Sequence, residues 1–266
     1  MKAVRLWLLL AAFFFCVSAG FIYPSPDEDL AILAAAYPGA FEILPGWGIR
    51  FPGGTLLPYD DGEQKDFDAL LEHPDLEDML SLPYPLGGGP PPAEHYDPGR
   101  FRPDAFFKAL YGRDEGEIRA TLRPVHWMPS LNGPRLLINT RFGIDEKLET
   151  IITELAALGP EYRRYLVPPG GSFNYRPIAA TGRLSPHSFG IAVDIATGPS
   201  HYWLWEKSGA GLYKNAIPRA IVDIFEKYGF IWGGAWYHFD TMHFEYRPEL
   251  LLKARGTKPR DQNVSH

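Results

Sequence analysis

Proline and glycine divide this chain into two halves that differ in what they can fold into. Up to about residue 131, runs such as GGGPPP at 87–92 and DPG at 97–99 interrupt every periodic stretch, and such residues mark turns. Only short helices fit there, and we predict them at residues 66–71, 75–80 and 103–111. We interpret residues 20–131 as an irregular region that forms a cap or wall around the second half.

Beyond residue 132 the apolar residues follow regular periods. Residues 145–158 place apolar side chains on one helical stripe, and residues 218–228 form a second such helix, closed by Gly229. Short runs rich in β-branched or aromatic residues predict strands at 135–140, 189–195, 230–232 and 242–246. Because strands and helices are mixed without a regular βαβ rhythm, we expect an α+β fold with a small, mostly antiparallel sheet and flanking helices.

The composition is that of an ordinary globular protein, with 45% hydrophobic and 22% charged residues over 266 positions. Lys and Arg number 26 against 32 Asp and Glu, so the net charge is −6. A chain with this balance lacks the broad positive field that attracts nucleic acid or anionic membranes. We therefore expect no nucleic-acid partner and a ligand that is selected by a local site.

The first nineteen residues have the pattern of an export signal. A cationic start with Lys2 and Arg5 precedes twelve apolar residues at 6–17, and small residues end the segment at Ala19. Twelve helical residues span about 18 Å, against about 30 Å for the hydrocarbon core of a membrane, so we expect a cleaved signal and no stable anchor. Cleavage after Ala19 takes the net charge to −8 and places the protein in the periplasm or outside the cell. Cys16 is the only cysteine and follows three Phe residues, so we expect no lipid anchor and no disulfide.

The first segment that carries chemistry is SPHSFGIAVD at residues 185–194. Side chains alternate along a strand, so Ile191 and Val193 point to one face and Asp194 to the other. An ionised carboxylate in an apolar strand requires a cation, hydrogen-bond donors or a metal beside it. His187, on the turn before the strand, is the nearest residue that can share a metal, although on its own this pair is more typical of two hydrogen-bonded structural residues.

The second segment is WYHFDTMHFEY at residues 236–246. Asp240 and His243 are three apart, so both reach one site only if the chain bends near Thr241. His187, Asp194 and His243 would then offer two imidazoles and one carboxylate to a metal and leave a fourth position for water, which is the arrangement of a catalytic centre. Asp240 is placed to take a proton from that water and to pass it to a leaving amine.

Other residues compete for the same roles. Glu245 lies two residues from His243 on the same face and is the rival base. His238 and His201 are rival ligands, but we interpret both as members of a partly buried aromatic cluster.

The pattern Ser-x-His-x-x-Gly-x-Ala-x-Asp at 185–194, followed by Asp240-x-x-His243, resembles the zinc peptidases that include D-alanyl-D-alanine carboxypeptidases, vancomycin-resistance dipeptidases and endolysin L-alanyl-D-glutamate endopeptidases. The resemblance covers about residues 171–251. It implies one zinc ion on His187, Asp194 and His243, with Asp240 as general base. It also implies that Arg176 steadies the substrate carbonyl oxygen as it becomes an oxyanion. Asp at 240, where many members have Glu, points to the endolysin-like branch.

The resemblance also implies a fold like that of hedgehog domains and DD-peptidases, and a substrate in the stem peptides of peptidoglycan. Such a substrate lies outside the cytoplasmic membrane, in agreement with export. We expect a signal peptide at 1–19, the irregular region at 20–131, a zinc peptidase domain at 132–252 and a flexible tail at 253–266. Ser185, Trp203 and Trp236 are further candidates for substrate contact, although a core role suits Trp236 equally well.

Three hypotheses follow. The favoured one is an exported zinc peptidase, with the choice between D-Ala-D-Ala and L-Ala-D-Glu bonds left open. The second is a noncatalytic zinc-containing binding or signalling protein on the same scaffold, against which the presence of both Asp240 and Arg176 argues. The third is a structural envelope protein whose His and Asp residues are buried hydrogen-bond partners.

Overall fold

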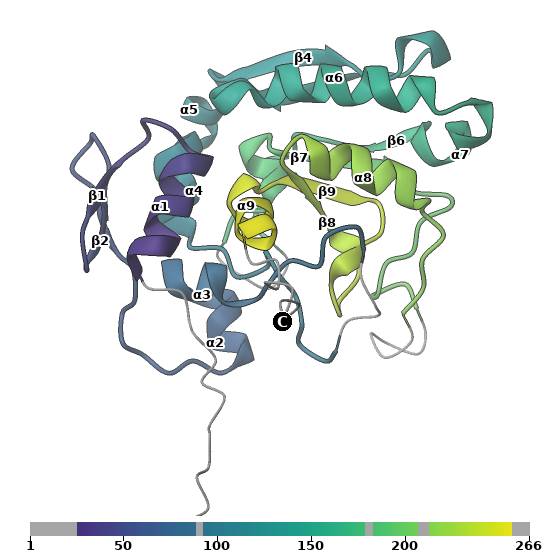
Figure 1. Cartoon of the computed structure of the whole chain (residues 1–266). Coiled ribbons are helices and arrows are strands. Elements are labelled where there is room, and N and C mark those ends of the chain that lie inside the picture. The colour runs from purple at the N-terminus through teal and green to yellow at the C-terminus, as the bar shows by residue number, and fades with distance from the viewer. Residues whose placement is uncertain (1–25, 89–92, 179–182, 207–212, 257–266) are drawn as a thin grey trace, which may run out of the picture.

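The computed structural model describes residues 26–88, 93–178, 183–206 and 213–256 (Figure 1). The predicted export signal and most of the predicted tail lie outside these ranges. The helices are α1 (Pro26–Ala36), α2 (Phe67–Glu72), α3 (Leu76–Ser81), α4 (Asp104–Tyr111), α5 (Glu115–Arg119), α6 (Ile144–Ala157), α7 (Arg163–Leu166), α8 (Arg219–Lys227) and α9 (Pro248–Gly256). The strands are β1 (Glu42–Leu44), β2 (Gly48–Arg50), β3 (Leu56–Pro58), β4 (Leu122–His126), β5 (Arg135–Asn139), β6 (Pro169–Gly171), β7 (Ala192–Ala196), β8 (Phe230–Trp232) and β9 (His243–Tyr246).

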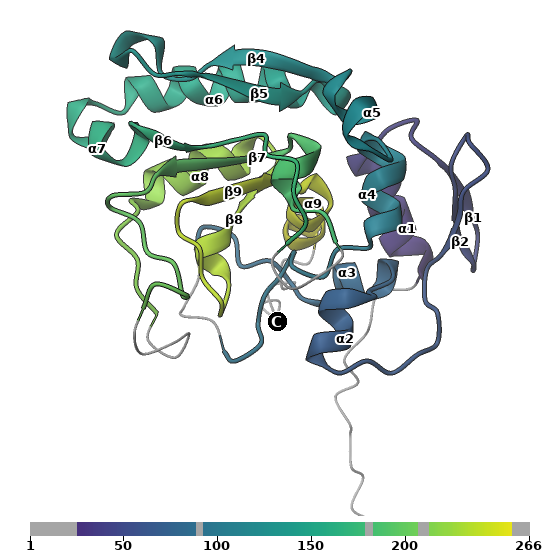
Figure 2. The same cartoon turned by 180° about the vertical axis from the view of Figure 1, so that it is seen from behind.

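The C-terminal half is built on a four-stranded sheet in the order β6-β7-β9-β8, with every pair antiparallel (Figure 2). The predicted α+β class with a small antiparallel sheet is therefore confirmed. The strand expected at 189–195 begins at Ala192, because Phe189 belongs to the turn before it. α8 packs on the sheet, where Phe225 stacks on Phe244 of β9 with ring centroids 3.9 Å apart.

A hairpin of β4 and β5 lies next to helix α6 and forms the adjoining layer (Figure 2). Val125 of β4 pairs with Leu136 of β5, so the hairpin crosses the boundary expected between residues 131 and 132. The predicted stripe of α6 is buried, Leu148 and Ile151 included, and α6 contacts α8 as well as both strands of the hairpin. The two halves of the sequence thus share one continuous hydrophobic core.

The N-terminal region is more regular than the sequence predicts. The three expected short helices are present as α2, α3 and α4, and Gly112 follows the last residue of α4. Four further features were not predicted, namely the eleven-residue helix α1, the antiparallel sheet β1-β2-β3, the short helix α5 and the strand β4. None of the helices in the described ranges has the length and apolar character that a membrane span requires.

Buried polar side chains join the N-terminal region to the C-terminal half. The Tyr84 hydroxyl donates a hydrogen bond to Glu226 of α8 at 2.8 Å. The Tyr37 hydroxyl, just after α1, donates to Glu249 of α9 at 2.6 Å. Because a buried carboxylate requires partners, these bonds link the C-terminal half to the region that precedes it.

Candidate active site

His187 is carried by a short 3₁₀ turn, η4 (Pro186–Phe189), directly before β7. Ser185 caps this turn, since its hydroxyl accepts a hydrogen bond from the His187 backbone N–H at 3.3 Å. Gly190 ends the turn with a φ of +68°, and a Cβ at this position would lie 2.5 Å from the Leu122 side chain. The Ser, His and Gly of the motif are therefore explained by one tight turn that directs His187 toward the sheet.

Asp194 and His243 face each other across neighbouring strands. In the antiparallel register of β7 and β9, Asp194 is paired with His243, and Ala192 with Glu245. Before β9 the chain turns at Thr241, where the His243 N–H donates to the Asp240 carbonyl oxygen at 3.2 Å. The bend that the sequence analysis required near Thr241 is thus confirmed.

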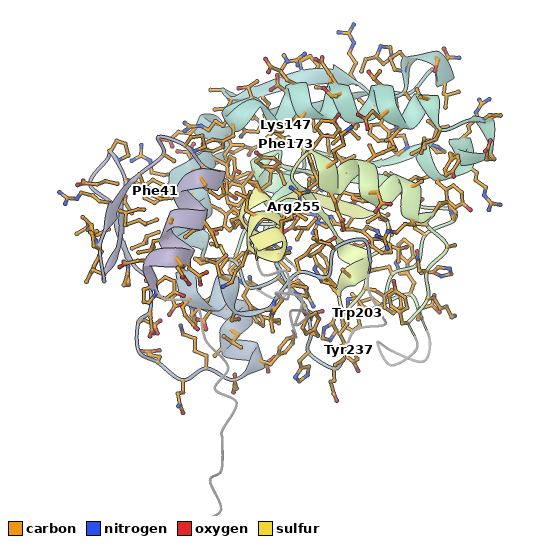
Figure 3. All side chains as sticks on the ribbon, in the orientation of Figure 1. Phe41, Lys147, Phe173, Trp203, Tyr237 and Arg255 are labelled. Carbon is orange, nitrogen blue, oxygen red and sulfur yellow. The ribbon has the colours of Figure 1, made fainter. Side chains whose placement is uncertain are left out.

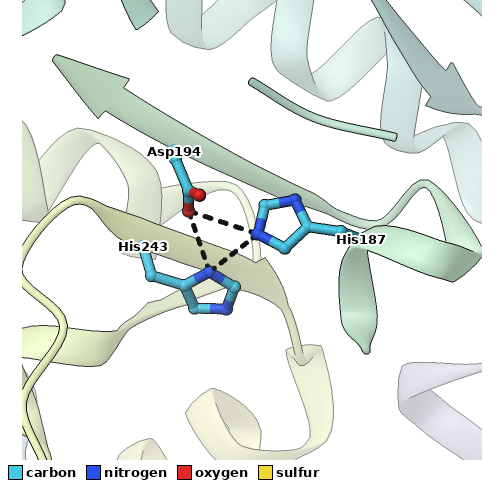
Figure 4. A group of neighbouring side chains, drawn as sticks. All are labelled: His187, Asp194 and His243. Carbon is cyan, nitrogen blue, oxygen red and sulfur yellow. Dashed lines mark hydrogen bonds and ion pairs between the residues drawn. The ribbon is translucent and has the colours of Figure 1, made fainter. Parts of the chain in front are cut away.

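Three donor atoms from these elements form a triangle (Figure 4). His187 Nε2 lies 3.2 Å from both His243 Nδ1 and Asp194 Oδ1, and His243 Nδ1 lies 3.0 Å from Asp194 Oδ1. Ligands about 2.0–2.1 Å from a tetrahedral zinc ion are separated from one another by about 3.3–3.4 Å. The triangle therefore fits three corners of such a tetrahedron, and imidazole and carboxylate are donors that zinc accepts.

The far nitrogen of each imidazole has a partner of its own. His187 Nδ1 lies 2.5 Å from the Ser172 carbonyl oxygen, and His243 Nε2 lies 2.9 Å from Glu245 Oε2. A nitrogen that faces an acceptor carries the proton, so the opposite nitrogen of each ring presents its lone pair to the triangle. These contacts orient both imidazoles as a metal site would require.

The triangle also favours positive charge. Burial alone would raise the pKa of Asp194, but His187 and His243 hold that pKa well below its usual range. Burial alone would lower the pKa of His243, but hydrogen bonds to Asp194 and Glu245 raise it to about 10. The carboxylates that stabilise a proton on His243 would stabilise a divalent cation at the triangle by the same attraction.

Glu245, the rival base, is fully buried and saturated with donors. Its two oxygens accept hydrogen bonds from Arg102 at 3.1 and 2.6 Å, from Arg247 at 3.1 Å and from His243. Burial alone would raise the pKa of Glu245, but Arg102 and then His243 hold it well below its usual range. A carboxylate has about four acceptor sites, and these donors fill those of Glu245. Glu245 therefore orients His243 and is poorly suited to accept a further proton.

Asp240 lies on the turn before β9 and has a different environment. Its Oδ1 is shielded from solvent and has no hydrogen-bond partner among the described residues. Burial raises the pKa of Asp240 to about 6, with the charge of His243 opposing this effect. An unpaired oxygen of raised pKa, beside the cleft described next, suits a proton acceptor.

The residues predicted for the site all border one cleft of about 280 Å³. They are Arg176, Ser185, His187, Asp194, Trp203, Trp236, Asp240 and His243. Arg176 is exposed, whereas Trp236 is buried with its ring tilted against His243, at a centroid distance of 5.5 Å. Trp203 lies at the same end of the molecule as Tyr237 (Figure 3).

The rival ligands lie outside the triangle. His238 borders the cleft, but its Nδ1 is 2.6 Å from the buried Asp97 and its ring stacks on Phe67. His201 Nδ1 lies 3.2 Å from Glu206. Each ring is thus engaged with a carboxylate other than Asp194.

The cleft also contains residues that sequence reasoning missed. Arg100 and Arg102, from the N-terminal region, border it together with Tyr202. Asp97 accepts a hydrogen bond from Arg100 Nη1 at 3.0 Å and holds His238 as well. In the sequence this stretch reads DPGRFRP, which indicates a turn but carries no signal for the part of the fold against which the turn packs.

A histidine–aspartate–histidine donor set, a buried carboxylate and an arginine in one cleft are the parts that a metal-dependent hydrolase requires. Residues 179–246 match the family model described as D-alanyl-D-alanine carboxypeptidase, which confirms the resemblance seen in the motif. This part of the chain is therefore similar to peptidases of that family. The matched segment includes the donor triangle and Asp240, whereas Arg176 lies just before this segment. No curated protein and no solved structure gives a significant match.

Proposed function

We propose that this protein is an exported zinc metallopeptidase that hydrolyses peptidoglycan stem peptides. The observation that carries the proposal is the donor triangle of His187, Asp194 and His243, in a cleft beside the Asp240 oxygen that has no partner among the described residues. An unpaired buried acceptor costs about 1–3 kcal/mol. A cluster with a purely structural role would gain nothing from leaving this oxygen unpaired, so the unpaired oxygen supports a catalytic role.

The residues of the cleft have different roles in peptide hydrolysis. Zinc, when bound, supplies Lewis acidity that polarises a carbonyl group and makes water more acidic. Asp240 takes the proton of the attacking water and delivers it to the leaving amine. The guanidinium of Arg176 stabilises the negative charge that develops on the carbonyl oxygen.

The proposal of export is supported by the leader pattern of residues 1–19 and by the location of the substrate. Peptidoglycan lies outside the cytoplasmic membrane, so a peptidase that acts on it must cross that membrane. The cleaved bond, D-Ala-D-Ala or L-Ala-D-Glu, depends on the shape of the cleft around the peptide.

Mass spectrometry of stem peptides after incubation with protein of known zinc content tests the proposal. We expect loss of a terminal D-Ala or scission after L-Ala, abolished by a chelator and restored by zinc. Asp240→Asn preserves the shape of the side chain but is a far weaker proton acceptor, so it should keep zinc while turnover falls by about 10² to 10⁴.

Two outcomes would contradict the proposal. Zinc-loaded wild-type protein that cuts neither linkage would favour the noncatalytic binding protein. Activity of Asp240→Asn close to that of the wild type would remove Asp240 as the base, and Glu245→Gln would then be the variant to compare.

A further inference from the structure

We infer that Arg102, in the N-terminal region, is a positioning residue for the metal site. It acts through Glu245, which in turn fixes the imidazole of His243. The inference rests on the proposed zinc site and extends it to a part of the chain outside the matched family segment. It assigns a role in the site to the region at 20–131.

The contacts run in an unbroken series from Arg102 to the donor triangle. Arg102 Nη2 donates to Glu245 Oε2 at 2.6 Å, and Arg102 Nε donates to Glu245 Oε1 at 3.1 Å. The same Oε2 accepts the hydrogen bond from His243 Nε2 at 2.9 Å. A two-point bond between guanidinium and carboxylate fixes the plane of the carboxylate, and the plane of Glu245 determines where His243 Nδ1 points.

The segment that carries Arg102 is itself held in place. The Pro98 carbonyl oxygen accepts a hydrogen bond from the Trp236 indole at 2.7 Å, and the Gly99 carbonyl oxygen accepts one from Arg247 at 2.6 Å. The Arg102 guanidinium also lies 5.8 Å from the centre of the Trp236 ring. Arg102 is therefore fixed relative to β9, as a positioning group must be.

Arg247 alone does not fix Glu245 in the same way. It contacts only Oε1, through a single hydrogen bond at 3.1 Å. Without Arg102, the carboxylate keeps one cationic neighbour but can rotate about its own axis, and the hydrogen bond to His243 loses its fixed direction. Loss of a partner behind a metal ligand typically weakens metal binding by about 10 to 100-fold.

The test compares zinc affinity of the full chain, measured by chelator competition, in Arg102→Met and Arg100→Met. Arg100 is a matched control, because it borders the same cleft but pairs with Asp97. We expect the dissociation constant for zinc to rise by about 10 to 100-fold in Arg102→Met and to stay within about twofold in Arg100→Met. The absorption spectrum of bound Co²⁺ should also change in Arg102→Met, because it reports ligand geometry.

Removing Arg102 leaves the buried charge of Glu245 with less compensation, so the variant is measured where circular dichroism shows it folded. Should it not fold, Arg102→Met combined with Glu245→Gln removes that charge and should fold with zinc affinity still weakened. Wild-type zinc affinity and an unchanged Co²⁺ spectrum in either folded variant would overturn the inference. Zinc-binding wild-type protein that cuts no peptide would refute the proposed function and leave this inference standing, whereas wild-type protein that binds no zinc would refute both.

Discussion

At the residue scale, each histidine of the donor triangle has a hydrogen-bond partner at the ring nitrogen that faces away from the triangle. Ser172 holds His187 and Glu245 holds His243, so both rings are oriented before any ion arrives. A site with three protein ligands binds a metal much more weakly when one of the ligands is removed. The three ligands are thus expected to behave alike.

We predict that His187→Ala, Asp194→Ala and His243→Ala each lose most of their bound zinc after dialysis, as measured by elemental analysis. His201→Ala should retain it, because that ring contacts Glu206 and not the triangle. Stoichiometric zinc in one of the first three variants would remove that residue from the ligand set.

Arg176 is expected to affect the rate of peptide hydrolysis and not the binding of zinc. We predict that Arg176→Ala keeps zinc but lowers kcat/KM on stem peptides by about 10², the scale of losing one oxyanion donor. Arg113→Ala is a suitable control, because Arg113 is exposed and pairs with Glu117 of α5, the helix that follows it. Equal kcat/KM in the two variants would show that Arg176 does not stabilise the oxyanion.

The donor set and Asp240 could be predicted from the sequence because the residues fall within two short segments with fixed local geometry. His187 and Asp194 share a turn and the strand that follows it, and Asp240 and His243 share a single bend. Arg102 could not be predicted in this way. It reaches Glu245 across 143 residues of sequence, and no local pattern indicates which distant loop will pack against β9.

At the scale of elements, the turn between η4 and β7 is the most constrained piece of the site. We predict that Gly190→Ala destabilises the protein by about 1–3 kcal/mol, because it forces a side chain into a left-handed conformation and against Leu122. Urea unfolding followed by tryptophan fluorescence measures this cost. Gly198→Ala is the control, since a Cβ there meets nothing within 4 Å; similar losses in both variants would contradict the argument.

Sequence periodicity predicted the elements that have one clearly apolar face. α6 and α8 are of this kind, and both helices begin and end within one residue of the expected limits. α1 was missed because its segment, PDEDLAILAAA, has apolar residues on most sides of its second half and so shows no stripe. The strands β1, β2 and β3 have three residues each, too few to show the alternation that marks a strand.

At the scale of the whole molecule, the N-terminal region and the C-terminal half share buried polar contacts and one hydrophobic core. We predict that a fragment of residues 132–256 does not fold, as judged by circular dichroism and limited proteolysis, whereas a chain starting at residue 26 does. The fragment lacks Tyr84, Arg102 and Tyr37, which pair with Glu226, Glu245 and Glu249 respectively. Each broken buried pair costs about 1–5 kcal/mol, against a typical total stability of about 5–15 kcal/mol. A compact, protease-resistant fragment would show that the two parts are separate domains.

The distance in sequence between Arg102 and Glu245 also bears on when the donor triangle and its supporting contacts can assemble. Contacts between residues so far apart form slowly, since closing the long loop between them costs entropy. A chain threaded through a membrane in an unfolded state has no assembled ion site, because the residues that support the site are far apart in the sequence. If the protein is exported in that way, it is inactive while it is still inside the cell that makes it. It would acquire its metal, and with it the ability to cut peptides, only at its destination.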